Sequence, residues 1–133
     1  MVGFCLLGAG ARAADAASDA EQRRLLVGVW EDDYQGHRTM TVRPDGSATM
    51  VVKLTGWKAA LYASQLRFEM TWTIEQGRLK KQTTSGEPAA KVKLILKMMG
   101  DRVDEQILEL TADRLWLLDQ NGKRKYDWHR TKP

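Results

Sequence analysis

The chain has 133 residues, of which 43% are hydrophobic and 29% are charged, and its formal net charge is +4. This length supports one domain with one hydrophobic core. Acidic residues are interspersed with basic ones, so the charge gives no reason to expect a nucleic-acid partner. No apolar run approaches the ~20 residues that a membrane-spanning helix needs, which predicts no transmembrane segment.

Residues 1–13 have features of a secretory signal peptide. A short apolar run passes through small residues into Ala11-Arg12-Ala13, a small-x-small sequence of the kind that signal peptidase cleaves. We therefore expect cleavage after Ala13 and a periplasmic or secreted protein. No basic residue follows Met1, so the segment is either a truncated leader or a disordered tail.

Cys5 is the only cysteine and lies within this leader. The mature domain would then have neither a disulfide nor a thiol, which excludes thiol catalysis and a cysteine-ligated metal. A lipid anchor on Cys5 is the less favoured alternative, because Phe4 stands where a small residue should precede a lipidated cysteine.

Residues 14–24 carry acids early and arginines late, which predicts a short helical lead-in. From residue 25 to residue 133 the pattern is that of a single β domain. Pro44-Asp45-Gly46 separates two alternating runs and predicts a hairpin. Residues 56–64 interrupt the alternation with small residues and good helix formers, which predicts a loop with one helical turn.

The clearest strand covers residues 66–75, where apolar and polar side chains alternate strictly. Its expected partner, residues 78–84, is rich in lysine and threonine and suits an exposed or edge strand. Residues 89–99 fit both a helix and a strand, and the helix is favoured because Gly100 follows in the position of a helix C′ residue. Strands resume at 103–110, 114–119 and 124–130.

About eight short strands joined by tight turns predict a mostly β fold, an up-and-down antiparallel β-barrel. Closure into a barrel would also leave no exposed sheet edge.

The first and last strands carry a resemblance to a known family. The segment from Leu26 to Trp30 resembles the Gly-x-Trp motif that opens the first strand of lipocalins and other calycins, with Gly28 as its glycine. The resemblance covers roughly residues 26–130 and implies that Arg130 packs over Trp30, a guanidinium on an indole face. The chain is shorter than most lipocalins and lacks their long C-terminal helix, so it looks most like the compact lipocalin-like proteins of bacteria.

The interior of an eight-stranded barrel is either filled by its own side chains or holds one small ligand. The predicted inward side chains show no charge and would suit an apolar guest, but they could equally form a filled core. This inward set is Trp30, Met40, Met50, Val52, Leu54, Phe68, Met70, Trp72, Leu108, Leu110 and Trp128. The residues expected to line or gate a cavity are Trp57, Tyr62, Phe68, Met70, Trp72 and Met50.

Candidate catalytic groups are sparse. His37 and His129 are the only histidines, and neither lies in a zinc-site or triad pattern, although Asp127 shares a strand face with His129. The acidic run from Glu31 to Asp33 is interpreted as a solvated rim. We therefore predict no catalytic residue, no metal and no cofactor.

Lysines 91, 93 and 97, with Lys80 and Lys81, would form a positive patch for lipid headgroups or an anionic partner if the two segments meet, though solubilising charge is favoured. The leading hypothesis is an exported, monomeric, non-catalytic lipocalin-like protein that binds a small apolar molecule or contacts an envelope partner. The alternative is a solid-core envelope interaction module without a ligand. A minor alternative is a hydrolase or isomerase at the barrel mouth.

Overall fold

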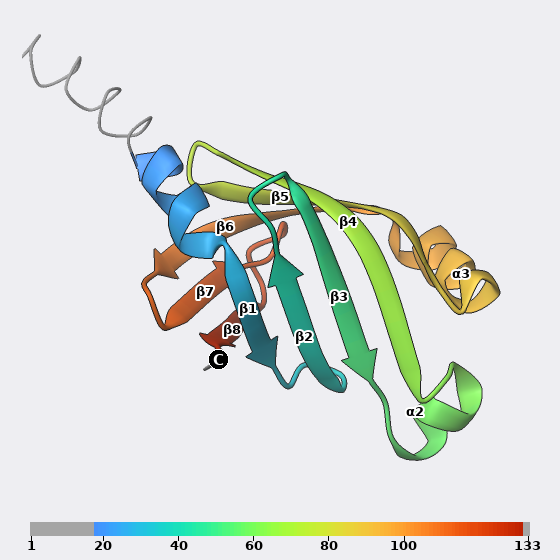
Figure 1. Cartoon of the computed structure of the whole chain (residues 1–133). Coiled ribbons are helices and arrows are strands. Elements are labelled where there is room, and N and C mark those ends of the chain that lie inside the picture. Colours follow the sequence, from blue (N-terminus) through green and yellow to red (C-terminus); the bar gives the residue numbers. More distant parts are fainter. Residues whose placement is uncertain (1–17, 132–133) are drawn as a thin grey trace, which may run out of the picture.

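The computed structural model describes residues 18–131, so the predicted leader and its cleavage site lie outside the described residues. This part of the chain contains eight strands, a helix before the first strand and two helices between later strands. The strands wrap into a barrel (Figure 1). The strands are β1 (Gly28–Asp32), β2 (His37–Val42), β3 (Ser47–Lys53), β4 (Gln65–Glu75), β5 (Arg78–Glu87), β6 (Arg102–Leu110), β7 (Arg114–Leu118) and β8 (Lys125–Arg130).

Each strand pairs antiparallel with the next, and β8 returns to β1, where Trp30 lies opposite Arg130 and Glu31 opposite His129. The closed antiparallel barrel predicted from the alternating pattern is therefore confirmed. The strand β5 lies between β4 and β6, so the interpretation of its polar sequence as an edge strand is wrong.

The two internal helices occupy the segments that break the strand pattern. Helix α2 (Gly56–Leu61) joins β3 to β4, which confirms the helical turn predicted within residues 56–64. Helix α3 (Ala89–Met99) joins β5 to β6, which confirms the favoured helix over the alternative strand. Among residues 18–131, no helix combines the length and the hydropathy needed to cross a bilayer.

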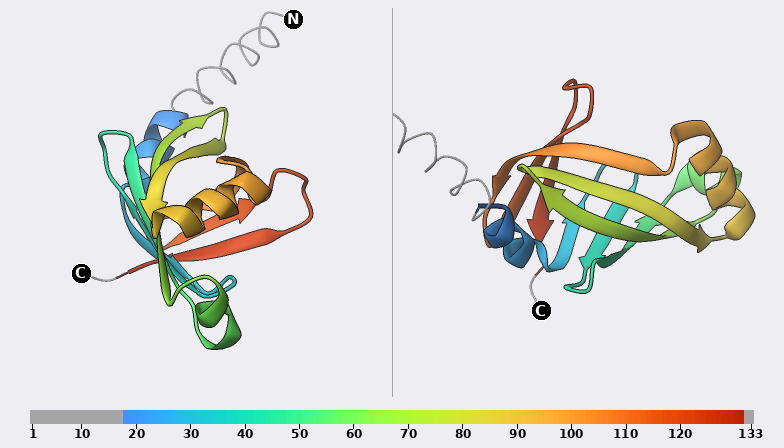
Figure 2. Two further views of the ribbon diagram at one scale, coloured as in Figure 1. Left: turned by 90° about the vertical axis from the view of Figure 1, so that its right-hand side faces the viewer. Right: turned by 90° about the horizontal axis from the view of Figure 1, so that it is seen from above.

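The two ends of the barrel differ. The turns β2–β3, β4–β5 and β6–β7 lie at the end that we call the Arg130 end, beside the N-terminal helix, whose described part covers residues 18–26. The side chain of Asp19 fixes that helix by accepting the backbone N–H groups of Gln76 at 2.6 Å and Gly77 at 2.8 Å. Helices α2 and α3 lie at the opposite end, the α3 end (Figure 2). The antiparallel strand order places the β7–β8 loop on that side of the barrel as well.

The hydrophobic core lies inside the barrel and includes side chains from both of its ends. Its fully buried side chains come from six of the strands, from the N-terminal helix and, in the case of Val92, from α3: Leu26, Trp30, Met40, Ile74, Leu79, Val92, Leu115, Leu117 and Trp128. One member of the predicted inward set is misplaced, because a register shift between Ile107 and Glu109 leaves Ile107 buried and Leu108 38% exposed.

Candidate functional site

Two ion pairs lie inside the barrel, contrary to the expectation of an uncharged interior. The first joins Asp32 of β1 to Arg38, its partner in the register of β2. Arg38 Nε donates to Asp32 Oδ1 at 2.6 Å, and Nη2 donates to Oδ2. The Arg38 side chain is 16% exposed and that of Asp32 only 4%, so Asp32 does not belong to the predicted solvated rim.

The second pair joins Lys81 of β5 to Glu105 of β6, with Nζ 3.2 Å from Oε1 and side chains only 6% and 7% exposed. Lys81 faces inward because it lies two residues after the fully buried Leu79 on the same strand. The predicted five-lysine patch therefore does not form: Lys81 is internal, and Lys80 contacts Glu75 at 3.4 Å.

Aromatic rings connect the two pairs. The guanidinium carbon of Arg38 lies 4.5 Å from the ring centroid of Trp128, 5.0 Å from that of Tyr34 and 5.4 Å from that of Tyr126. Lys81 Nζ lies 6.0 Å from the Trp128 centroid. Trp128 thus contacts cations of both pairs, and cation–π attraction is strongest where water is displaced. We call these seven residues the charged cluster: Asp32, Tyr34, Arg38, Lys81, Glu105, Tyr126 and Trp128.

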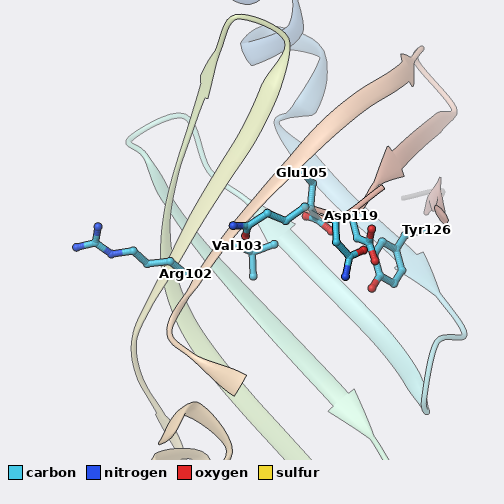
Figure 3. A pocket seen from close by; sticks show the side chains of 7 residues that line it. Arg102, Val103, Glu105, Asp119 and Tyr126 are labelled. Atoms are coloured by element: carbon cyan, nitrogen blue, oxygen red, sulfur yellow. The ribbon is translucent and has the colours of Figure 1, made fainter. Parts of the chain in front are cut away.

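A pocket of about 520 Å³ opens beside the charged cluster at the α3 end. Figure 3 shows Glu105, Asp119 and Tyr126 gathered there, with Arg102 directed away from them. The pocket lies where the first half of β6 passes the β7–β8 loop, and its lining is Arg102, Val103, Glu105, Asp119, Gln120, Asn121 and Tyr126.

Hydrogen bonds within the β7–β8 loop hold the polar wall of this pocket. The backbone N–H of Lys123 donates to Asp119 Oδ1 at 2.9 Å and to Asn121 Oδ1 at 3.2 Å, and Gly122 N–H donates to the Asp119 carbonyl at 3.0 Å. Gly122 has φ +74°, a left-handed conformation that favours glycine. The wall is therefore a structured turn.

Tyr126 belongs to both the pocket and the charged cluster. Burial raises the pKa of its phenol above 10.0, and the nearby Tyr34, Glu105 and Asp119 raise this pKa further. The phenol therefore stays neutral at physiological pH and keeps its hydrogen-bond donor.

Two buried polar atoms in this region lack a hydrogen-bond partner among the residues that the structure describes: Glu105 Oε1, whose contact with Lys81 is not oriented as a hydrogen bond, and Trp128 Nε1. Such atoms are uncommon in folded proteins because burial without a partner costs free energy. Glu105 also lines the pocket, while its Oε1 is buried beside Lys81 Nζ.

The six residues predicted to line or gate a cavity are dispersed, and none of them lines this pocket. Met50 and Phe68 lie opposite each other on β3 and β4, and Met70 is buried one row further along. Trp72 is directed to the Arg130 end, where its indole donates to the carbonyls of Arg43 and Ser47. Trp57 is 70% exposed on α2, and Tyr62 follows that helix.

The histidines lie outside the pocket. His129 Nε2 is 3.7 Å from Asp127 Oδ1 on an exposed part of β8, where Asp127 is already held by Arg114. His37 Nδ1 lies 3.0 Å from Asp33 Oδ1, and this contact raises the pKa of His37 above 6.5. Within residues 18–131, no three histidine, cysteine or acidic side chains converge as a metal site would require.

Sequence reasoning missed Arg38, Lys81, Glu105 and Asp32 because interior positions were sought among apolar residues. A usable signal was present: the alternation in β5 that buries Leu79 also places Lys81 on the inner face. A lysine at such a position requires a buried acid nearby.

The closed eight-stranded barrel with Arg130 stacked on Trp30, 4.3 Å from guanidinium carbon to ring centroid, is a lipocalin-like fold. A crystal structure of a lipocalin-like protein from Bacteroides uniformis superposes on it with a TM-score of 0.57 and 12% sequence identity, over 80% of this chain and 99% of that one. No family model matches the sequence, and no curated protein matches it. The likeness is one of fold.

Proposed function

We propose that this chain is an exported, non-catalytic lipocalin-like protein that binds a small molecule in the pocket beside the charged cluster. The observation that carries the proposal is the pocket itself, about 520 Å³ in volume and bounded by the buried carboxylate of Glu105. Pockets of this size accommodate small ligands, and a few convergent polar groups set their orientation. The leader-like residues 1–13 support export.

The lining favours a ligand with hydrogen-bonding groups over the wholly apolar guest expected from the sequence. Five of the seven lining residues carry charged or amide side chains, which stand beside the apolar surface of Val103 and Tyr126. A purely apolar ligand would cover those polar groups without pairing them, which costs free energy. A small amphipathic molecule would stack on Tyr126 and donate to Glu105.

A binding role accounts for the site better than catalysis does. The pocket contains two carboxylates, but Glu105 is neutralised by Lys81 and Asp119 Oδ1 accepts a loop N–H. Neither histidine reaches the pocket lining. The acid and base of a hydrolase would need to converge on one reacting atom.

Native mass spectrometry tests the proposal. The protein is purified gently from its own host and measured before and after organic extraction, and a mass that is lost on extraction identifies the ligand. Val103→Trp, which fills the pocket, should abolish that mass. Leu108→Trp is the matched control, because Leu108 lies on the same strand with similar exposure, 38% against 42%, but does not line the pocket.

A wild-type protein that carries no extractable mass would contradict the proposal and favour the solid-core interaction module. A ligand that survives in Val103→Trp would show that binding occurs elsewhere in the barrel.

A further inference from the structure

Helix α3 has a second apolar face. It packs on the barrel through Val92, which is 2% exposed, with Ile95 and Leu96 beside it. Ala90, Leu94 and Met98 are spaced by four residues, which places them in one row on another side of the helix. Leu94 is 50% exposed and Met98 62%. The barrel therefore accounts for one apolar face of α3 and leaves the other in solvent.

Lysines flank this exposed row on both sides. Lys93 and Lys97 are themselves four residues apart and form a parallel row beside Leu94 and Met98, while Lys91 lies on the other flank. No acidic residue occurs in α3; Glu87 and Asp101 stand just before and after it. The exposed side of the helix is thus apolar along its middle and positive along its edges.

Helix α2 places another exposed apolar side chain at the same end of the barrel. Trp57 is 70% exposed, and Lys58 Nζ lies 5.8 Å from its ring centroid. Both views in Figure 2 place α2 and α3 at the same end of the barrel. We call these residues of the two helices the α2–α3 face: Trp57, Lys58, Ala90, Lys91, Lys93, Leu94, Lys97 and Met98.

We propose that the α2–α3 face docks on an anionic phospholipid bilayer. Exposed apolar groups flanked by lysines are the pattern of helices that lie in a membrane interface, where apolar side chains enter the acyl boundary and lysines meet lipid phosphates. A tryptophan suits the same depth, because its indole has apolar and polar parts. This proposal does not depend on the pocket, whose lining shares no residue with the face.

Charge argues against a second copy of the chain as the occupant. Two such faces related by a two-fold axis would bring the lysines of α3 against the same lysines of the other copy, and like charges in contact are unfavourable. An anionic lipid surface neutralises all of them at once.

Vesicle co-sedimentation of the full chain tests the proposal. We expect binding to vesicles of phosphatidylcholine mixed with phosphatidylglycerol, little binding to phosphatidylcholine alone, and release at high salt because screening weakens the lysine contribution. The fluorescence emission of Trp57 should shift to shorter wavelength with anionic vesicles, and Trp57→Ala should remove that shift.

Two variants separate the apolar and the charged contributions. Leu94→Asp with Met98→Asp should reduce partitioning about tenfold or more, because two charges would enter the interface. Lys93→Glu with Lys97→Glu should reduce it by a similar factor and remove its salt dependence. The matched controls are Leu108→Asp, an exposed apolar residue on β6, and Lys123→Glu with Lys125→Glu in the β7–β8 region.

Three results would overturn the proposal: absence of vesicle binding by the wild-type chain, equal binding to neutral and anionic vesicles, or α3 variants that bind as well as the controls. Sedimentation velocity without lipid tests whether the α2–α3 face binds a second copy of the chain instead. A dimer that Leu94→Asp with Met98→Asp dissociates would assign the face to self-association instead.

Discussion

Lys81 and Glu105 form an ion pair across strands β5 and β6 with both side chains more than nine-tenths buried. Lys81 lies opposite Val103 and Glu105 opposite Leu79, so the pair is diagonal across the ladder. Moving two charges out of water is costly, and the attraction between them offsets that cost only in good geometry. The pair stands next to Trp128 and to the pocket, the part of the barrel that we propose binds a ligand.

Removal of one member of this pair should be far more harmful than removal of both. Lys81→Met leaves the Glu105 carboxylate buried without its cation and should lower the free energy of unfolding by about 3–5 kcal/mol. Lys81→Met with Glu105→Leu should recover most of that loss, because an apolar pair of similar volume fills the same space. Urea denaturation measures both changes.

The same double variant reports on function. If Glu105 accepts a hydrogen bond from the ligand, the refolded double variant should lose the extractable mass even though it is stable. A double variant as unstable as Lys81→Met alone would show that the cost lies in packing and not in an uncompensated charge.

Arg130 secures the Arg130 end by its hydrogen bonds as well as by its contact with Trp30. Its guanidinium donates to three backbone carbonyls, those of Val27 at 2.9 Å, Leu25 and Ala112. Arg130→Lys keeps the charge but loses the planar fork, and should destabilise the fold by about 2–3 kcal/mol. Arg114→Lys is the control: the Arg114 guanidinium stacks on Trp116 at 4.6 Å, but the side chain is 37% exposed and its ion pair with Asp127 is open to solvent, so this substitution should cost much less than Arg130→Lys. Equal losses in the two variants would contradict the assigned role of the carbonyls.

The glycine of the Gly-x-Trp motif makes room for Arg130. Gly28 has φ +142°, and a Cβ built on it would lie 2.1 Å from Arg130 Nη1. Gly28→Ala should therefore both strain the backbone and displace the guanidinium, at a cost of about 3 kcal/mol. Gly122→Ala, at φ +74° with no atom within 4 Å of the new Cβ, isolates the backbone contribution and should cost about 1 kcal/mol.

A double-mutant cycle measures the coupling between Gly28 and Arg130. Once Arg130 is replaced by alanine, Gly28→Ala should cost no more than its backbone strain, so the two losses should not add. Full additivity in thermal or urea unfolding would show that Gly28 and Arg130 act independently.

The sequence was sufficient for the strands and insufficient for the interior charges. The alternation in β4 and the Pro44-Asp45-Gly46 turn reflect local rules, namely which face a side chain occupies and where the chain can reverse, so the barrel could be predicted. The partner of Lys81 could not, because its distance to Glu105 depends on the register of β5 and β6 across the α3 insertion. The pocket could not be predicted either, because it depends on the position of the β7–β8 loop relative to the first half of β6.

His37 provides a pH-dependent contact at the β1–β2 turn. The hydrogen bond that the His37 ring donates to Asp33 raises the pKa of His37 above 6.5 most strongly, and the charge of Glu31, whose Oε1 lies 3.6 Å from Nε2, raises this pKa further. Because the folded-state pKa lies above the unfolded value, the stabilising contribution is fully present below pH 6.5 and is lost as the pH rises through the folded-state pKa. The His37 side chain is largely exposed, so the change in the free energy of unfolding should be small and salt-sensitive.

NMR titration of the His37 ring should show the raised pKa. Asp33→Asn should lower this pKa toward 6.5, whereas the control Asp45→Asn, in the distant β2–β3 turn, should leave the pKa of His37 unchanged. A His37 pKa that does not respond to Asp33→Asn would show that the pairing seen here does not persist in solution.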